Sequence, residues 1–178
     1  MRGDKNQIEI PFWFVLDVIS HLEKVHYDET GLSIGEASSD ILMHTIFHEL
    51  AHAFIAMYGI PILGKEEDAA DTLATILLIE YFSDGQDIAL TAADFFAIES
   101  ENREGGLQDE DFGGEHSLDE QRHYSTLCYI YGSSPKEYAF LVEEGRLPKE
   151  RSETCIDEYE EKVQNWSKLL EPYIKPIK

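Results

Sequence analysis

The segment at residues 58–65, Tyr-Gly-Ile-Pro-Ile-Leu-Gly-Lys, constrains the fold more than any other feature of this 178-residue sequence. We expect one helix to begin at one of the capping residues 38–40 and to end just before Gly59, with Pro61 beyond it as a second stop signal. The next helix is expected over residues 65–82, with acidic side chains in its first turn. The two helices must therefore meet in a tight hairpin.

Apolar residues at three- and four-residue spacing predict further helices on both sides of this hairpin. Their expected ranges are 12–25, 91–102, 117–131, 135–145 and 153–170. Residues 8–11 are interpreted as a short strand that ends at Pro11, and the Gly-rich, acidic segment 103–116 as a mobile loop. Since there is no internal repeat and no long linker, the sequence predicts a mostly α fold (α+β with little sheet) in a single domain over residues 1–178.

The charge balance limits the partners of the protein. Acidic residues number 36 against 14 basic ones, for a net charge of -22. This charge argues against nucleic acid or an anionic membrane surface, because both are polyanions. It is compatible with a cationic substrate or with metal ions, although most of it is expected to be a solvated surface.

Targeting and redox signals are weak. No apolar run is long enough to span a membrane. The N-terminal apolar stretch carries Asp17 and no small-residue cleavage site follows it, so either the protein stays in the cytoplasm or its signal peptide has already been removed. Cys128 and Cys155 fit no C-x-x-C metal motif, and they are either one disulfide or two buried thiols.

The strongest chemical motif is His48-Glu49-Leu50-Ala51-His52, which has the H-E-x-x-H pattern. Residues four apart on a helix lie above one another, so His48 and His52 can direct their imidazoles at one zinc ion. Glu49 lies about 100° around the helix from His48 and can reach a water on the metal without binding the metal itself. This is the position of a general base.

A third protein ligand is expected on the following helix. Glu67 and Asp71 are four residues apart and share a face, so Glu67 is our candidate for the ligand and Asp71 for the group that orients a histidine, with Asp71 as the rival ligand. Glu66 has no partner at that spacing and is expected to face solvent. His44 continues the histidine row, but it lies two turns from His52 and is interpreted as a supporting or core residue.

His116, between the predicted loop and the next helix, is a candidate hydrogen-bond donor to an oxyanion. Arg122 and His123 are the alternatives for this role, and an exposed loop histidine is the non-functional interpretation of His116. Asp119 and Arg122 are three apart and are expected to form a salt bridge of small energetic consequence.

Four blocks together resemble a bacterial metallopeptidase family that is a domain of unknown function. They are FHELAHAF, PILGKEEDAADTLATILL, EHSLDEQRHYSTLCYIYGSSP and RSETCIDEYEEKVQNWSKLLEPY, and the resemblance extends over residues 8–173. It implies a zinc peptidase with a zincin-like fold of minimal sheet. Members are often exported, which would favour an exported protein with a Cys128–Cys155 disulfide.

The glutamate with an aspartate four residues further on also resembles the third-ligand motif of the thermolysin-like zincins. That resemblance implies His48, His52 and Glu67 as zinc ligands, Glu49 as the base and Asp71 as the partner of a ligand histidine. This chain departs from those enzymes in its much shorter segment between the motifs and in having little visible sheet. Those enzymes bind the substrate backbone along an edge strand.

We therefore predict a zinc-dependent hydrolase, a metallopeptidase that cleaves peptide or protein substrates with Glu49 as general base. The alternative is a non-catalytic binding protein that keeps a structural metal on the same scaffold, and a third reading is hydrolysis of an amide that is not a peptide. The sequence indicates neither the substrate nor the oligomeric state.

Overall fold

The computed structural model describes residues 7–103 and 105–174. Ten helical segments follow one another in this part of the chain: α1 Phe12–Lys24, the 3-10 helix η1 Tyr27–Thr30, α2 Ile34–Tyr58, α3 Glu66–Tyr81, α4 Gly85–Asn102, α5 Asp109–Gly113, α6 Asp119–Ser133, α7 Phe140–Glu143, α8 Lys149–Ser152 and α9 Cys155–Leu170. No strand forms within those residues, so the mostly α fold class is confirmed. None of these helices is both long and apolar enough to cross a membrane.

The strand expected at residues 8–11 is wrong. Residues 7–11 are irregular, and Pro11 serves as the N-cap of α1. A strand needs a neighbour to satisfy its backbone groups, and no segment of the described chain offers one. The apolar residues that suggest a strand are thus the approach to a helix.

Two capping devices set the length of α2. Ser33 and Glu36 form a capping box, in which the Ser33 hydroxyl accepts from the Glu36 amide (3.3 Å) and the Glu36 carboxylate accepts from the Ser33 amide (3.1 Å). The helix therefore begins a turn earlier than predicted. It ends where expected, because Gly59 adopts the left-handed conformation at φ 62°.

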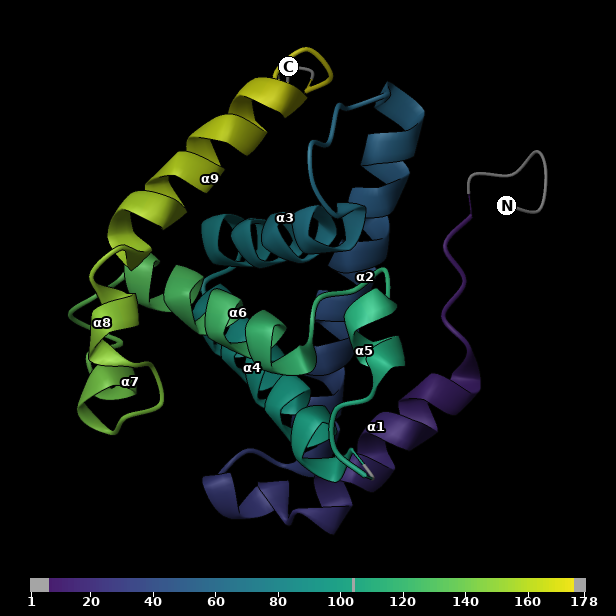
Figure 1. Ribbon diagram of the computed structural model, residues 1–178, viewed down its shortest axis with the longest axis vertical. Helices are drawn as coiled ribbons and strands as arrows, with labels where there is room; N and C mark the ends of the chain where they lie inside the picture. Colours follow the sequence, from purple (N-terminus) through teal and green to yellow (C-terminus); the bar gives the residue numbers. More distant parts are fainter. Residues whose placement is uncertain (1–6, 104, 175–178) are drawn as a thin grey trace.

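The connection after α2 brings α3 across it. Figure 1 shows α3 running across α2 rather than alongside it, with the link 59–65 looping between them. α4 packs against both helices, α6 packs on α4, and α9 packs on α6. The central core lies among these five helices and includes the fully buried Leu73, Leu127 and Ile130, while a second cluster, with Val18 and Leu22, joins α1 to α2 and α4.

The start of α4 and the region after α6 differ from the prediction. α4 begins at Gly85 rather than at Thr91, and a Cβ at Gly85 would lie 1.9 Å from the Leu78 carbonyl oxygen of α3. Only glycine permits this approach. The helix expected over 135–145 shrinks to α7, because a turn precedes it in which the buried Tyr138 donates a hydrogen bond to Asp87 (2.9 Å).

α6 and α9 are joined covalently as well as by packing. Cys128 of α6 and Cys155, the first residue of α9, form a disulfide with their Cα atoms 5.0 Å apart. One turn further along α6, a Cβ on Gly132 would lie 2.2 Å from the Cys155 carbonyl oxygen, so the two backbones are in close contact. The pairing implied by the family resemblance is thus present.

Candidate metal centre

Three side chains from α2 and α3 meet where the two helices cross. The Nε2 atoms of His48 and His52 are 3.1 Å apart, and each lies 3.1 Å from Oε2 of Glu67. A tetrahedral zinc ion with bonds of about 2.0–2.1 Å holds its ligand atoms roughly 3.3–3.4 Å from one another. Two imidazole nitrogens and one carboxylate oxygen in a nearly equilateral triangle therefore fit a metal ion in both chemistry and spacing.

Asp71 contacts the other nitrogen of His48. Oδ1 of Asp71 lies 2.7 Å from Nδ1 of His48, and because a carboxylate only accepts, Nδ1 must donate. In the neutral ring, this leaves the lone pair on Nε2 facing Glu67 and His52. Asp71 and Glu67 therefore lie on opposite sides of the His48 ring, and only Glu67 faces both histidines.

The guanidinium of Arg122 binds the Asp71 carboxylate. Arg122 of α6 donates from Nε to Oδ2 of Asp71 (2.8 Å) and from Nη2 to Oδ1 (3.1 Å), and its guanidinium lies 4.0 Å from the centre of the Phe96 ring. Burial acts to raise the pKa of Asp71, but the hydrogen bonds from His48 and Arg122 outweigh it and hold that pKa well below its usual range. The expected Asp119–Arg122 pair is present at 3.8 Å, but it is secondary to the pair with Asp71.

Glu66 faces solvent and has no partner on its own helix, as expected, but it contacts a histidine of α2. Its side chain is 51% exposed, yet Oε1 lies 2.9 Å from Nδ1 of His52. Burial disfavours a charged His52, but the hydrogen bond to Glu66 and the charge of Glu67 outweigh this and raise its pKa. The spacing of acidic residues along α3 gives no sign of this contact, because the partner lies on α2.

His44 is a core residue, in agreement with the prediction. It is buried, its Nε2 lies 3.3 Å from Oγ1 of Thr75, and its ring meets that of Phe96 edge to face. Burial lowers the pKa of His44 to about 4, so the ring is neutral at ordinary pH. It supports α2 one turn before His48.

Glu49 faces the open side of the site. It lines a cavity of about 620 Å³ together with His48, His52, Glu67 and His116. In the part of the chain that the structure describes, its carboxylate has no hydrogen-bond or ion-pair partner. The carboxylate is thus free to interact with a molecule in this cavity.

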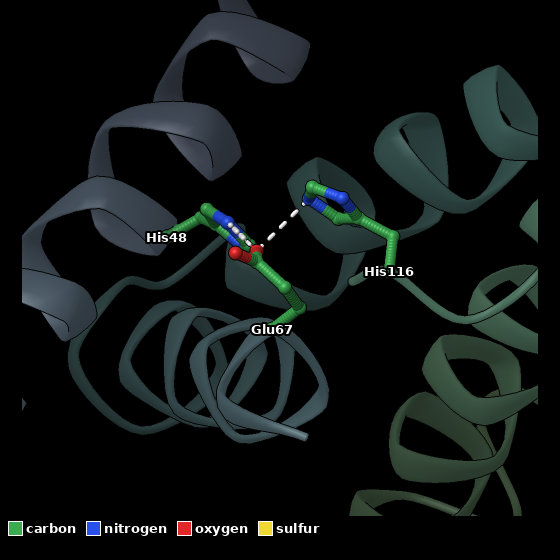
Figure 2. Close-up of side chains that lie close together, drawn as sticks. All are labelled: His48, Glu67 and His116. Carbon is green, nitrogen blue, oxygen red and sulfur yellow. Dashed lines mark hydrogen bonds and ion pairs between the residues drawn. The ribbon is translucent and has the colours of Figure 1, made fainter. Parts of the chain in front are cut away.

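His116 reaches the site from the loop before α6. Its Nε2 lies 2.9 Å from Oε2 of Glu67, and Figure 2 shows Glu67 between His116 and His48. One ligand atom from each of these three residues falls within 4.8 Å of the others, which is a spacing compatible with a metal ion. Lys65 fastens the loop, because its Nζ donates to the carbonyl oxygens of Gly114 (3.2 Å) and His116 (2.8 Å).

The two alternatives to His116 are occupied elsewhere. Arg122 is engaged with Asp71, and Nδ1 of His123 lies 2.7 Å from the Ala93 carbonyl oxygen on α4. His116 itself is 50% exposed but lies at the edge of the metal-site cavity rather than in open solvent. The structure therefore gathers His48, Glu49, His52, Glu67 and His116 around one cavity, and Asp71 contacts His48 on the side away from it.

A helical fold that presents two histidines, a glutamate ligand candidate and a free glutamate to one cavity defines a candidate metal-dependent hydrolase. The chain belongs to the family described as "Putative metallopeptidase", whose model matches residues 2–170. Comparison with curated proteins and with solved structures gave no match. Membership of this family implies a metal ion at the site, and the donor atoms described above fit one.

Proposed function

We propose that this protein is a zinc-dependent metallopeptidase. The observation that carries the proposal is the triangle of His48 Nε2, His52 Nε2 and Glu67 Oε2, with all three distances at 3.1 Å. Two histidines and one glutamate, with a further position open to the cavity, form the ligand set of a catalytic zinc site rather than of a closed structural one. Imidazole ligands also disfavour magnesium and calcium, which prefer oxygen.

The bound zinc ion would polarise a carbonyl group and lower the pKa of a water to about 7. Glu49 takes a proton from the attacking water and returns it to the leaving amine. His116 donates a hydrogen bond from Nε2 to the substrate oxygen that gains negative charge. The same Nε2 atom points toward Glu67 in the structure. Asp71 and Glu66 keep the two ligand histidines oriented through their Nδ1 atoms.

The substrate is a peptide or a protein. The cavity in front of Glu49 is open to one side and has room for an extended peptide segment, with a volume of about 620 Å³. The net charge of -22 disfavours polyanions such as nucleic acid. We also propose an exported location, supported by the Cys128–Cys155 disulfide, because such bonds persist in oxidising compartments.

One observation favours a second function, a non-catalytic protein with a structural metal. His116 lies close enough to Glu67 and His48 to act as a fourth protein ligand, which would close the site. In that case His116 contributes to metal affinity and Glu49 has no chemical role.

Metal analysis combined with two variants separates the two functions. We expect about one zinc per chain in protein purified without chelators, and its loss in His48→Ala. Glu49→Gln should keep the zinc and lose activity on a peptide library by about 10²–10⁴-fold, the usual contribution of a general base. Glu110→Gln, which removes an exposed carboxylate outside the site, is the matched control.

The result for His116→Ala decides the role of this histidine. A peptidase should retain its zinc and show a lower kcat, whereas a structural site should release the metal. Wild-type protein that carries zinc but cleaves no member of the library, together with zinc loss in His116→Ala, would contradict the peptidase proposal.

A further inference from the structure

A second, smaller cavity adjoins the metal site on the side of α1 and α4. Its volume is about 210 Å³, and it shares His48, Glu49 and His116 with the larger cavity. A group seated in it would therefore lie beside the bond that reacts. At roughly 30 Å³ per water molecule, the cavity has space for about seven waters, or for one long side chain.

Aromatic and aliphatic side chains form one part of its wall. Phe14 comes from α1, Ile41 from α2, and Phe95 and Phe96 from α4. Such a wall favours the aliphatic stem of a side chain, and aromatic faces also attract cations. The wall thus admits two classes of occupant, apolar side chains and long cationic ones.

Glu99 distinguishes between these classes. It lies one turn beyond Phe95 on α4 and lines the same cavity. Over residues 7–103 and 105–174 its carboxylate has neither a hydrogen bond nor an ion pair. Burial, followed by the negative charge of Asp119, raises the pKa of Glu99 to about 7.

The one cationic group that acts on Glu99 in the described part of the chain does not neutralise it. Arg122 lines the same cavity and lowers the pKa of Glu99, but burial and the charge of Asp119 have larger effects, and Asp17 adds a further negative charge. The Arg122 guanidinium is already bonded to Asp71 at two positions. An apolar occupant would leave this carboxylate buried without a partner, which is costly. An ammonium or guanidinium group would supply the missing counter-charge.

We propose that this cavity binds the side chain of a lysine or an arginine next to the bond that is cut, with Glu99 as its counter-ion. The inference rests on the proposed peptidase function and adds a substrate class to it: peptides with a basic residue at the cleavage site. The stem packs against Phe95 and Phe96, and the cationic end meets Glu99. The acidic character of the whole chain attracts such peptides over longer distances.

Cleavage-site mapping tests the proposal in the zinc-loaded full-length protein. Alanine-rich peptides carry lysine, norleucine or glutamate on one side or the other of a central bond, at about 0.15 M salt to screen distant charges. Norleucine is the matched probe, because it keeps the stem of lysine and lacks the ammonium. We expect kcat/KM for lysine to exceed that for norleucine by at least about tenfold, and Glu99→Gln to remove this difference.

The control variant is Glu101→Gln, which removes the same charge from an exposed position on the same helix. It should retain the preference for lysine. If the wild-type protein cleaves norleucine peptides as well as lysine peptides, the inference is overturned. This comparison needs no variant, so a folding defect in Glu99→Gln cannot obscure the result.

A binding measurement keeps this test separate from the test of catalysis. The zinc-loaded Glu49→Gln variant is titrated with the lysine and norleucine peptides, and we expect a Kd at least about tenfold lower for lysine, a difference that Glu99→Gln abolishes in the same background. The wild-type protein could cleave no peptide while the difference in Kd is still found. In that case the peptidase proposal fails and the basic-residue pocket stands. Equal affinity for both peptides, or none for either, overturns the pocket.

Discussion

Carboxylates decide which nitrogen of each candidate ligand histidine is available for a metal. Asp71 accepts from Nδ1 of His48, and Glu66 lies at hydrogen-bonding distance from Nδ1 of His52. Both imidazoles therefore present Nε2 to Glu67. The difference between the two is burial, because Asp71 is enclosed and paired with Arg122 while Glu66 is exposed to solvent.

We expect Asp71→Asn to weaken zinc binding by about 10–100-fold, the usual effect of losing a group that orients a ligand histidine. The variant should also be less stable by about 3–5 kcal/mol, because Arg122 remains in a largely buried position without its partner. Competition with a chromogenic chelator measures the zinc affinity, and urea unfolding measures the stability.

Asp68→Asn is the matched control for this change. Asp68 lies in the first turn of α3 with an exposed side chain, and its removal should cost less than about 1 kcal/mol. Zinc affinity of Asp71→Asn equal to that of the wild-type protein would show that Asp71 does not orient His48.

Much of the candidate site could be predicted from spacing alone. His48, His52, Glu67 and Asp71 form two i,i+4 pairs on helices joined by a short link, so local geometry brings them together. Glu99 could not be predicted, since its isolation depends on α1, α2 and α4 converging around it. The roles of all these residues remain predictions.

At the scale of the elements, the helices themselves could be predicted, but several of their ends could not. The end of α2 at Gly59 follows from local turn chemistry. The start of α4 at Gly85 does not, because it depends on contact with the Leu78 carbonyl of another helix. Segment 103–116 contains the short helix α5, and Arg103 at its start pairs with Asp119 (2.9 Å) and Glu120 (2.8 Å) on α6.

The loop that carries His116 depends on one lysine. We expect Lys65→Met to remove the hydrogen bonds to the Gly114 and His116 carbonyl oxygens and so to loosen this loop by about 1–2 kcal/mol, a factor of 5–30. Hydrogen exchange of the amides in residues 113–117 should accelerate by that factor. Zinc content should stay the same while kcat falls.

Lys136→Met serves as the comparison, because Lys136 is exposed in the turn after α6. It should change neither exchange in the loop nor kcat. Unchanged exchange in Lys65→Met would mean that other contacts hold the loop in place.

At the scale of the whole molecule, the C-terminal helix is held by one covalent bond and a tight backbone contact. The disulfide closes a loop of 27 residues between α6 and α9, and Trp166 and Leu170 of α9 are buried in the central core. The metal-site residues lie on α2, α3 and the loop before α6, and none of them lies on α9. The C-terminal helix therefore reaches the site indirectly, through its contacts with α3 and with α6, which carries Arg122.

We expect the Cys128→Ala/Cys155→Ala double variant to lose about 3–4 kcal/mol of stability, the chain-entropy value for a loop of this length. Urea unfolding at equilibrium measures the loss. Dithiothreitol should destabilise the wild-type protein by a similar amount and should not change the stability of the double variant. The double variant thus serves as the control for any effect of dithiothreitol on the metal. Identical unfolding midpoints for wild-type protein and double variant would contradict the prediction.

The short separation between the candidate ligands along the chain has a consequence for the order of folding. Glu67 lies only 15 residues from His52 and 19 from His48, whereas Arg122 is 51 residues from Asp71. The entropy lost on closing a chain segment grows with its length, so the α2–α3 contact closes at lower cost than the contacts to α6. A growing chain that has produced α3 already holds the three candidate ligand atoms. His116 follows only after α4 and α5, and the Arg122 guanidinium only with α6.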